Sequence, residues 1–147
     1  MLLAAGAIAV DNWVETDRER IESQVTAVVR SFERGDAEGM LQHISPQAVC
    51  EQLLVTFAVE VVTVEHPLSL KDIQIRLQNE DSIAISTFRV NGTVAVRGRT
   101  VGHQPSQWQV TWRKEANEWK IRRIQELDPL KSEPINRLGQ IGAQLCP

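Results

Sequence analysis

The segment WQVTWRKEANEWKI, residues 108–121, carries the clearest pattern for the fold. Large apolar side chains alternate with polar ones on both sides of a short turn at Ala116-Asn117; they are Trp108, Val110, Trp112, Trp119 and Ile121. This period of two is typical of a half-buried β-strand, because successive side chains point to opposite faces of a sheet. We therefore predict a hairpin whose tryptophans pack in the core or against one another across the strands.

The same alternation is found earlier in the chain. It covers residues 73–77 and 83–88, on either side of a turn at Asn79-Glu80-Asp81, and it returns at residues 93–96. The Asn91-Gly92 pair is typical of a tight turn, yet the strand pattern resumes at once, so we favour a bulge within one long strand. We expect residues 97–105 to connect this strand to the next. The second half of the chain is thus predicted to be an antiparallel sheet.

Helices are predicted before the sheet. Thr16 and Glu19 have the spacing of a capping box, in which each side chain accepts a hydrogen bond from the other's backbone, and apolar residues then recur with helical spacing. Asp36 is suited to cap a short second helix, and Pro46 to stand at the first position of a third. The end of the third helix is left open, because residues 59–64 are rich in β-branched side chains. The predicted fold class is α+β.

Composition and charge limit the classes of function. A chain of 147 residues, 42% hydrophobic and 24% charged, is typical of one globular domain. Residues 1–65 hold eleven acidic and four basic side chains, and residues 89–123 hold eight basic and two acidic ones. Electrostatic attraction between the two halves of the chain explains this uneven distribution of charge as well as binding to a charged partner does. Because no nucleic-acid recognition motif accompanies the basic residues and tryptophans, we do not expect nucleic acid as a partner.

No cofactor, metal ion or catalytic residue is predicted. The chain lacks a glycine-rich phosphate loop and a Gly-x-Ser-x-Gly turn. Its histidines, which lack zinc-ligand spacing, are interpreted as structural or solvated; they are His43, His66 and His103. Cys50 and Cys146 lack the CxxC spacing of a metal or redox site. We interpret them as unpaired thiols, and leave their pairing open.

The order of these elements resembles the nuclear transport factor 2-like superfamily, which has the cystatin-like fold and includes SnoaL-like proteins. The resemblance covers residues 16–128 and rests on RGDAEGML, residues 34–41, and on the hairpin of residues 108–121. It implies a cone in which N-terminal helices pack in the concave face of a curved, mostly antiparallel sheet. The superfamily includes isomerases, dehydratases, epoxide hydrolases, polyketide cyclases and transport factors, so the fold alone selects no activity.

Three functions follow from the cone. We favour a noncatalytic accessory or protein-interaction domain, in which the cone is filled by its own side chains. The alternative is a binding site for a small, anionic molecule, for which the candidate residues are Arg89, Arg97, Arg123 and Asp72. An enzyme of the lyase, isomerase or hydrolase type ranks third. The chain has no tyrosine for a site of the ketosteroid isomerase kind, and Arg89 with Asp72 or Asp81 does not match an epoxide hydrolase site.

The chain is divided into an apolar N-terminal segment, residues 1–12, the domain itself, residues 13–128, and a C-terminal tail, residues 129–147. We expect the tail to lie over the surface without forming an element. The apolar run of residues 2–10 is too short to span a membrane and lacks a basic region before it. We interpret it as the remnant of a signal or membrane anchor, which favours a tethered, extracytoplasmic domain over a cytoplasmic one. A homodimer through the sheet and a monomer both stay open.

Overall fold

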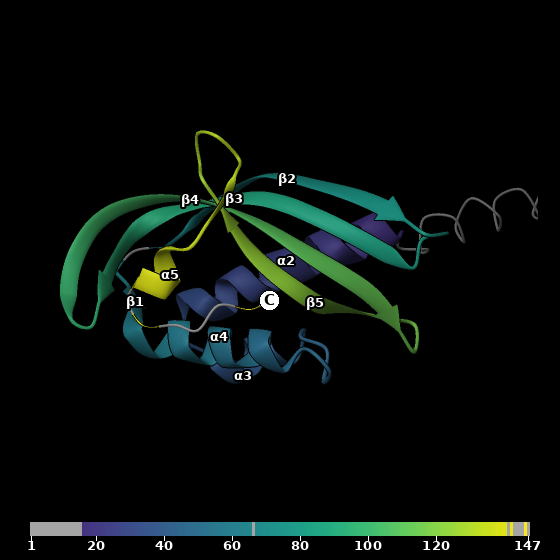
Figure 1. Cartoon of the computed structure of the whole chain (residues 1–147), viewed down its shortest axis with the longest axis horizontal. Coiled ribbons are helices and arrows are strands. Elements are labelled where there is room, and N and C mark those ends of the chain that lie inside the picture. The colour runs from purple at the N-terminus through teal and green to yellow at the C-terminus, as the bar shows by residue number, and fades with distance from the viewer. Residues whose placement is uncertain (1–15, 66, 141, 143–145, 147) are drawn as a thin grey trace, which may run out of the picture.

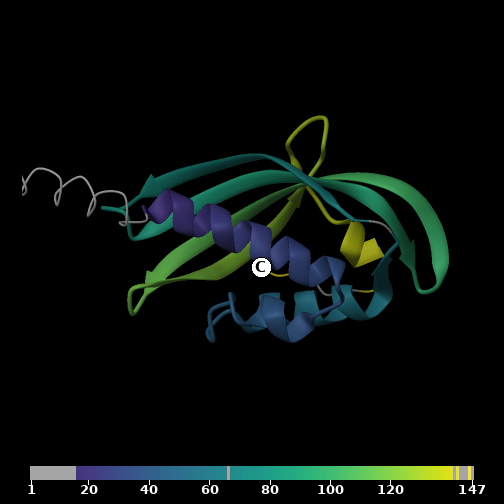
Figure 2. The ribbon, with the colours of Figure 1, turned by 180° about the vertical axis from the view of Figure 1, so that it is seen from behind.

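The computed structural model describes residues 16–65, 67–140, 142 and 146. Its helices and strands, in chain order, are α2 (Asp17–Glu33), α3 (Ala37–Leu41), α4 (Val49–Val61), β1 (Val62–Val64), β2 (Ser69–Gln78), β3 (Ile83–Val96), β4 (Arg99–Glu115), β5 (Glu118–Leu127), β6 (Pro134–Ile135) and α5 (Arg137–Gln140). Figures 1 and 2 show the helices gathered on the concave side of a strongly bent sheet. The α+β fold class is confirmed.

The first two helices begin where the sequence predicts. The hydroxyl of Thr16 accepts from the backbone N–H of Glu19 at 3.2 Å, and the carboxylate of Glu19 accepts from the backbone N–H of Thr16 at 3.2 Å, which completes the capping box. The carboxylate of Asp36 caps α3 by accepting from the backbone N–H of Gly39 at 2.9 Å. Both helix starts depend on neighbouring residues alone, because the groups that accept hydrogen bonds from the free backbone N–H groups lie within one turn of the helix.

The third helix begins later than predicted. It starts at Val49, with Pro46 in the preceding turn. The backbone N–H of Ser45 donates to the carbonyl of Ile121 at 2.8 Å, and the N–H of Ile121 donates to the carbonyl of His43 at 2.7 Å. This short parallel bridge to β5 keeps the chain out of a helix until it has left the sheet edge. Both alternatives for residues 59–64 are partly right, because α4 ends at Val61 and leads directly into β1.

The sheet has six strands. Five follow the order β1-β3-β4-β5-β6, and the sixth, β2, pairs with another part of the β3 edge that β1 also uses. All of these pairs are antiparallel. The long strand through Asn91-Gly92 is confirmed, but the predicted bulge there is wrong, because the pairing with β4 stays in register at both residues and shifts only between Val94 and Ala95. The expected connection over residues 97–105 is wrong. The chain turns at Arg97-Gly98 and β4 already begins at Arg99.

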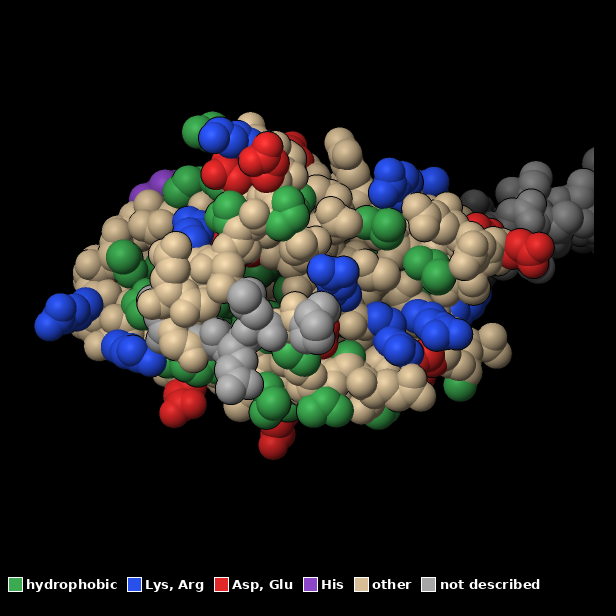
Figure 3. Space-filling model, in the orientation of Figure 1, with side chains coloured by type: hydrophobic (Ala, Val, Ile, Leu, Met, Phe, Trp, Pro, Cys, Tyr) green, Lys and Arg blue, Asp and Glu red, His purple; other side chains and the backbone are tan. Residues whose placement is uncertain are grey.

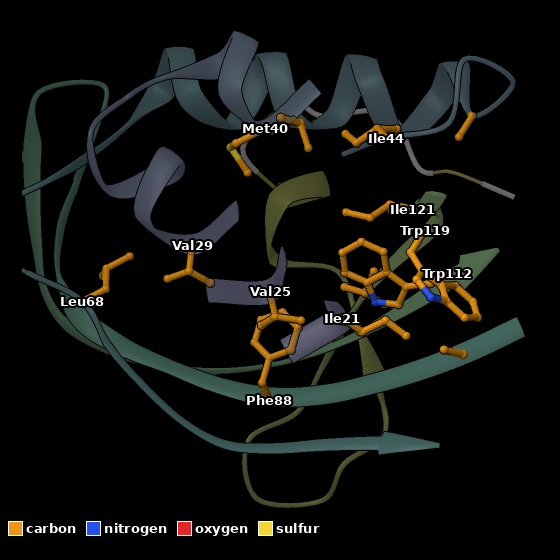
Figure 4. Close-up of a cluster of buried hydrophobic side chains, with 14 residues drawn as sticks. Ile21, Val25, Val29, Met40, Ile44, Leu68, Phe88, Trp112, Trp119 and Ile121 are labelled. Carbon is orange, nitrogen blue, oxygen red and sulfur yellow. The ribbon is translucent and has the colours of Figure 1, made fainter. Parts of the chain in front are cut away.

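The core lies between α2 and the concave face of the sheet, as Figure 4 shows. Trp112 and Trp119 are almost completely buried there, beside Ile21 and Ile121. The indole N–H of Trp112 donates to the hydroxyl of Ser86 at 2.9 Å, so a polar group within the core is satisfied. The prediction that the hairpin tryptophans pack in the core is thus confirmed for these two. Trp13 lies outside the described residues.

The C-terminal tail differs from its prediction. It forms β6, which pairs with Glu126 and Leu127 of β5, and then α5. Cys146 forms a disulfide with Cys50 in α4, across a separation of 96 residues. The interpretation of both cysteines as unpaired thiols is therefore wrong, because their spacing along the chain gave no sign that α4 and the tail meet. No helix in the described part of the chain is long and apolar enough to cross a membrane. The apolar run of residues 2–10 lies outside it.

Candidate ligand-binding cavity

The cone is not completely filled. A cavity of about 360 Å³, which we call the inner cavity, lies between α2, α4 and the bent sheet. Its walls are mainly aliphatic and aromatic, and include Val28, Phe32, Val55, Phe88, Val94 and Trp108. Successive side chains of β3 point to opposite faces of the sheet, so Phe88, Val90 and Val94 share the concave face and form part of the cavity wall. The volume is at the lower end of the ~300–1,000 Å³ range of small-molecule sites.

The polar side chains along the inner cavity are largely bonded to the protein itself. The hydroxyl of Ser106 donates to the carbonyl of Val90 and accepts from the indole N–H of Trp108 at 2.9 Å. The side-chain amide of Gln104 donates to a backbone carbonyl at 3.2 Å and accepts from the guanidinium of Arg137 at 3.4 Å. These groups therefore have few hydrogen bonds left to offer a ligand.

In the part of the inner wall that the structure describes, the two charged side chains neutralise each other. Glu126 on β5 is 8% exposed, and its carboxylate accepts from Nε of Arg137 in α5 at 2.7 Å. Nη2 of Arg137 lies 2.5 Å from the same carboxylate oxygen, so two guanidinium nitrogens contact one oxygen of Glu126. Neither residue was predicted from the sequence. The one available signal was a glutamate at a concave-facing position of β5, two residues after Ile124.

A second cavity of about 270 Å³, the outer cavity, adjoins the first. Its wall shares five residues with the inner cavity: Leu54, Trp108, Ile124, Glu126 and Leu138. Its other lining residues come from the edge of β5 and from the tail, and include Arg123, Gln125, Ile135 and Cys146. Figures 1 and 2 show α5 between the bend of the sheet and α4, where the tail forms part of both walls.

The four predicted ligand-binding residues do not form one site. Asp72 and Arg89 come together as an ion pair at 3.4 Å, and Arg89 also donates to the carbonyl of Pro129 at 3.0 Å. Arg89 alternates with the concave-facing Phe88 and Val90, so it lies on the convex face. Arg97 is exposed at the turn between β3 and β4. Arg123 borders the outer cavity at the edge of β5, although it alternates with the concave-facing Ile124 and pairs in register with Thr111 on the convex side of the sheet. Ligand binding by these four stays a prediction.

The other titratable candidates lie away from both cavities. The ring of His43 is bonded to the side-chain amide of Gln24 at 3.0 Å, and burial, followed by the charge of Lys120, lowers the pKa of His43. His103 is exposed on β4, Asp81 is exposed in the turn after β2, and His66 lies outside the described residues. Neither cavity places a free carboxylate beside a histidine, as far as the described residues show. The walls are suited to binding rather than to acid–base chemistry.

One cluster has the residue types of a metal site. The carboxylate of Glu51 and the sulfurs of Cys50 and Cys146 lie within 4.8 Å of one another. The two sulfurs are joined in the disulfide, and a metal ion requires thiolates as ligands. While the disulfide is intact, the cluster can therefore offer a metal ion the carboxylate of Glu51 but no thiolate.

No family model and no curated protein matches the sequence. Solved structures are similar to it. A nuclear transport factor 2-like protein from Cytophaga hutchinsonii is 10% identical, with a TM-score of 0.59 over 75% of this chain and 96% of that one. One from Rhodospirillum rubrum, described as of unknown function in nutrient uptake, is 14% identical, with a TM-score of 0.57 over 71% and 93%.

A third, from Shewanella oneidensis and of unknown function, is 14% identical, with a TM-score of 0.54 over 77% of this chain and 100% of that one. At such low identity the likeness concerns the fold and carries no activity from one protein to another. Together with the helices in the concave face of the curved sheet, it shows that this chain has the fold of the nuclear transport factor 2-like superfamily, which its sequence resembles.

Proposed function

We propose that this chain is a noncatalytic domain that binds a small apolar molecule in the inner cavity. The observation that carries the proposal is the apolar wall around about 360 Å³ of space inside the cone. Moving apolar surface from water onto such a wall is favourable by about 25 cal/mol for each Å² buried. The space favours the binding alternative over a cone filled by its own side chains.

The polar groups of the wall support an apolar occupant. A charged group wholly inside the inner cavity would meet no free counter-charge from the described lining residues, because Glu126 and Arg137 are paired with each other. Burying an unpaired charge is strongly unfavourable, whereas a hydrocarbon gains contacts and needs no hydrogen bond. The same pairing is the reason to rank binding above catalysis, since Glu126 would have to leave Arg137 before it could act as a base.

Titration with a neutral apolar dye, whose emission rises in apolar surroundings, tests the proposal. Val94→Glu places a charge in the wall, and Val94→Phe fills part of the space. Val49→Glu is the matched control, because Val49 is 59% exposed on the outside of α4. We expect both Val94 variants, if they melt cooperatively, to bind the dye about tenfold or more weakly, and the control to bind as the wild type does. A folded wild type that does not bind the dye would refute the proposal.

The disulfide supports a proposal about the compartment. Disulfides persist mainly in oxidising environments, such as the periplasm or the outside of the cell. We infer that the domain works there, in keeping with a tether formed by residues 1–12, which lie outside the described part. Thiol labelling of the protein from its native cells, without reductant, should leave Cys50 and Cys146 unmodified. Labelling of both would place the domain in a reducing compartment.

A further inference from the structure

The inner and outer cavities are neighbours. They share five residues, and among these Trp108 of β4 and Leu138 of α5 present apolar surface to both. The outer cavity therefore lies next to the inner one, toward the edge of β5. A molecule that extends from the inner into the outer cavity would meet the residues that line the outer cavity alone.

Those side chains differ in charge from the inner wall. Arg123 on β5 is exposed, and its guanidinium makes no hydrogen bond or ion pair with the described part of the chain. Glu126 borders both cavities, but Arg137 neutralises it. Among the described residues that border the outer cavity, Arg123 therefore contributes a positive charge that no acidic partner offsets. Figure 3, in the orientation of Figure 1, shows hydrophobic side chains exposed among both basic and acidic ones.

From this arrangement, and resting on the proposed function, we propose that the ligand is an anionic amphiphile. Its hydrocarbon chain lies in the inner cavity and its carboxylate lies on Arg123 in the outer cavity. A guanidinium presents two parallel N–H donors that match the two oxygens of a carboxylate. The anionic head stays at the exposed end, so it avoids the desolvation that an ion inside the inner cavity would suffer.

The geometry also predicts how affinity depends on the ligand. Each further methylene that enters the inner cavity should strengthen binding about fourfold until the space is full. A carboxylate should bind more tightly than the alcohol of the same chain length, because only the carboxylate pairs with Arg123. Added salt should weaken the carboxylate more than the alcohol, because the ion pair is exposed.

Displacement of the neutral dye from the full chain by dodecanoate and by dodecan-1-ol tests the proposal. We compare the wild type, Arg123→Gln, and the control Arg76→Gln, which removes an exposed positive charge from β2 away from both cavities. Arg123→Gln should weaken dodecanoate about tenfold and leave dodecan-1-ol unchanged, since a hydrogen-bonded charge is lost. Arg76→Gln should leave both unchanged.

The outcomes separate this inference from the proposed function. If the dye binds but dodecanoate binds no better than dodecan-1-ol, or if Arg123→Gln weakens dodecanoate no more than Arg76→Gln does, the charged head is not recognised by Arg123 and the inference is wrong. If the dye binds and neither compound displaces it, the inference is also wrong, while an apolar ligand of another shape stays supported. If the dye itself does not bind the folded wild type, the proposed function is wrong.

Discussion

The disulfide between Cys50 and Cys146 should contribute a large part of the stability of the domain. It closes a loop of 96 residues, which is most of the described chain. In the chain-entropy account, a cross-link that closes a loop of roughly 100 residues removes conformational entropy from the unfolded chain and so raises its free energy by about 4.7 kcal/mol at 25 °C. Domains of this kind have only about 5–15 kcal/mol of stability in total.

The perturbation is the double variant Cys50→Ser with Cys146→Ser, compared with the oxidised wild type. We expect the free energy of unfolding in urea to fall by about 4 kcal/mol. For a domain of this length, each kcal/mol lost from the free energy of unfolding lowers the melting temperature by about 3–5 °C. The melting temperature should therefore fall by roughly 10–20 °C. Circular dichroism follows both transitions. A reductant should lower the wild type to the level of the variant and leave the variant unchanged.

A small effect would refute this reasoning. If mass spectrometry shows that the wild type is oxidised and the variant loses less than about 1 kcal/mol, loop closure is not what the bond contributes. The tail would then be held mainly by the pairing of β6 with β5 and by the ion pair between Arg137 and Glu126. Replacing Arg137 by Leu in the serine variant separates these contributions, because it leaves the buried Glu126 without its partner.

Three further predictions concern the core, the pH dependence and the oligomeric state. Ser86→Ala should lower the free energy of unfolding in urea by about 1–3 kcal/mol, because the buried indole N–H of Trp112 loses its acceptor; an unchanged value would contradict this account. The hydrogen bond from Trp119, followed by that from Lys114, lowers the pKa of Asp17 below its usual 3.8. The stability that this carboxylate contributes is therefore full at a pH above 3.8 and is lost as the pH falls below 3.8. Urea unfolding of Asp17→Asn should therefore show a deficit against the wild type at neutral pH that shrinks in acid, and a deficit independent of pH would contradict it. A homodimer through the sheet stays a prediction, and light scattering that gives 16.5 kDa at every concentration would exclude it.

Much of the fold was predictable because its signals are local. The capping box of Thr16 and Glu19 acts within one helical turn, and the alternation around Trp112 and Trp119 reflects which face of a strand meets the core. The candidate site was much less predictable. Of the four residues proposed from the sequence, Arg123 borders a cavity, and the arginine and glutamate that pair at the inner wall were missed.

The sequence by itself determined the order of the elements, the concave-facing positions of the strands and most of the turns, because each of these follows from the conformational preferences of neighbouring residues. The start of α4 depends instead on a contact between distant segments, since a bridge from Ile44 to Ile121 holds the chain at the sheet edge until then. The pairing of Cys50 with Cys146 and of Glu126 with Arg137 likewise depends on segments that meet only in the folded chain. Whether the cone is filled depends on the distances between α2, α4 and the bent sheet, and the same alternation of residues suits a packed core and a cavity equally well.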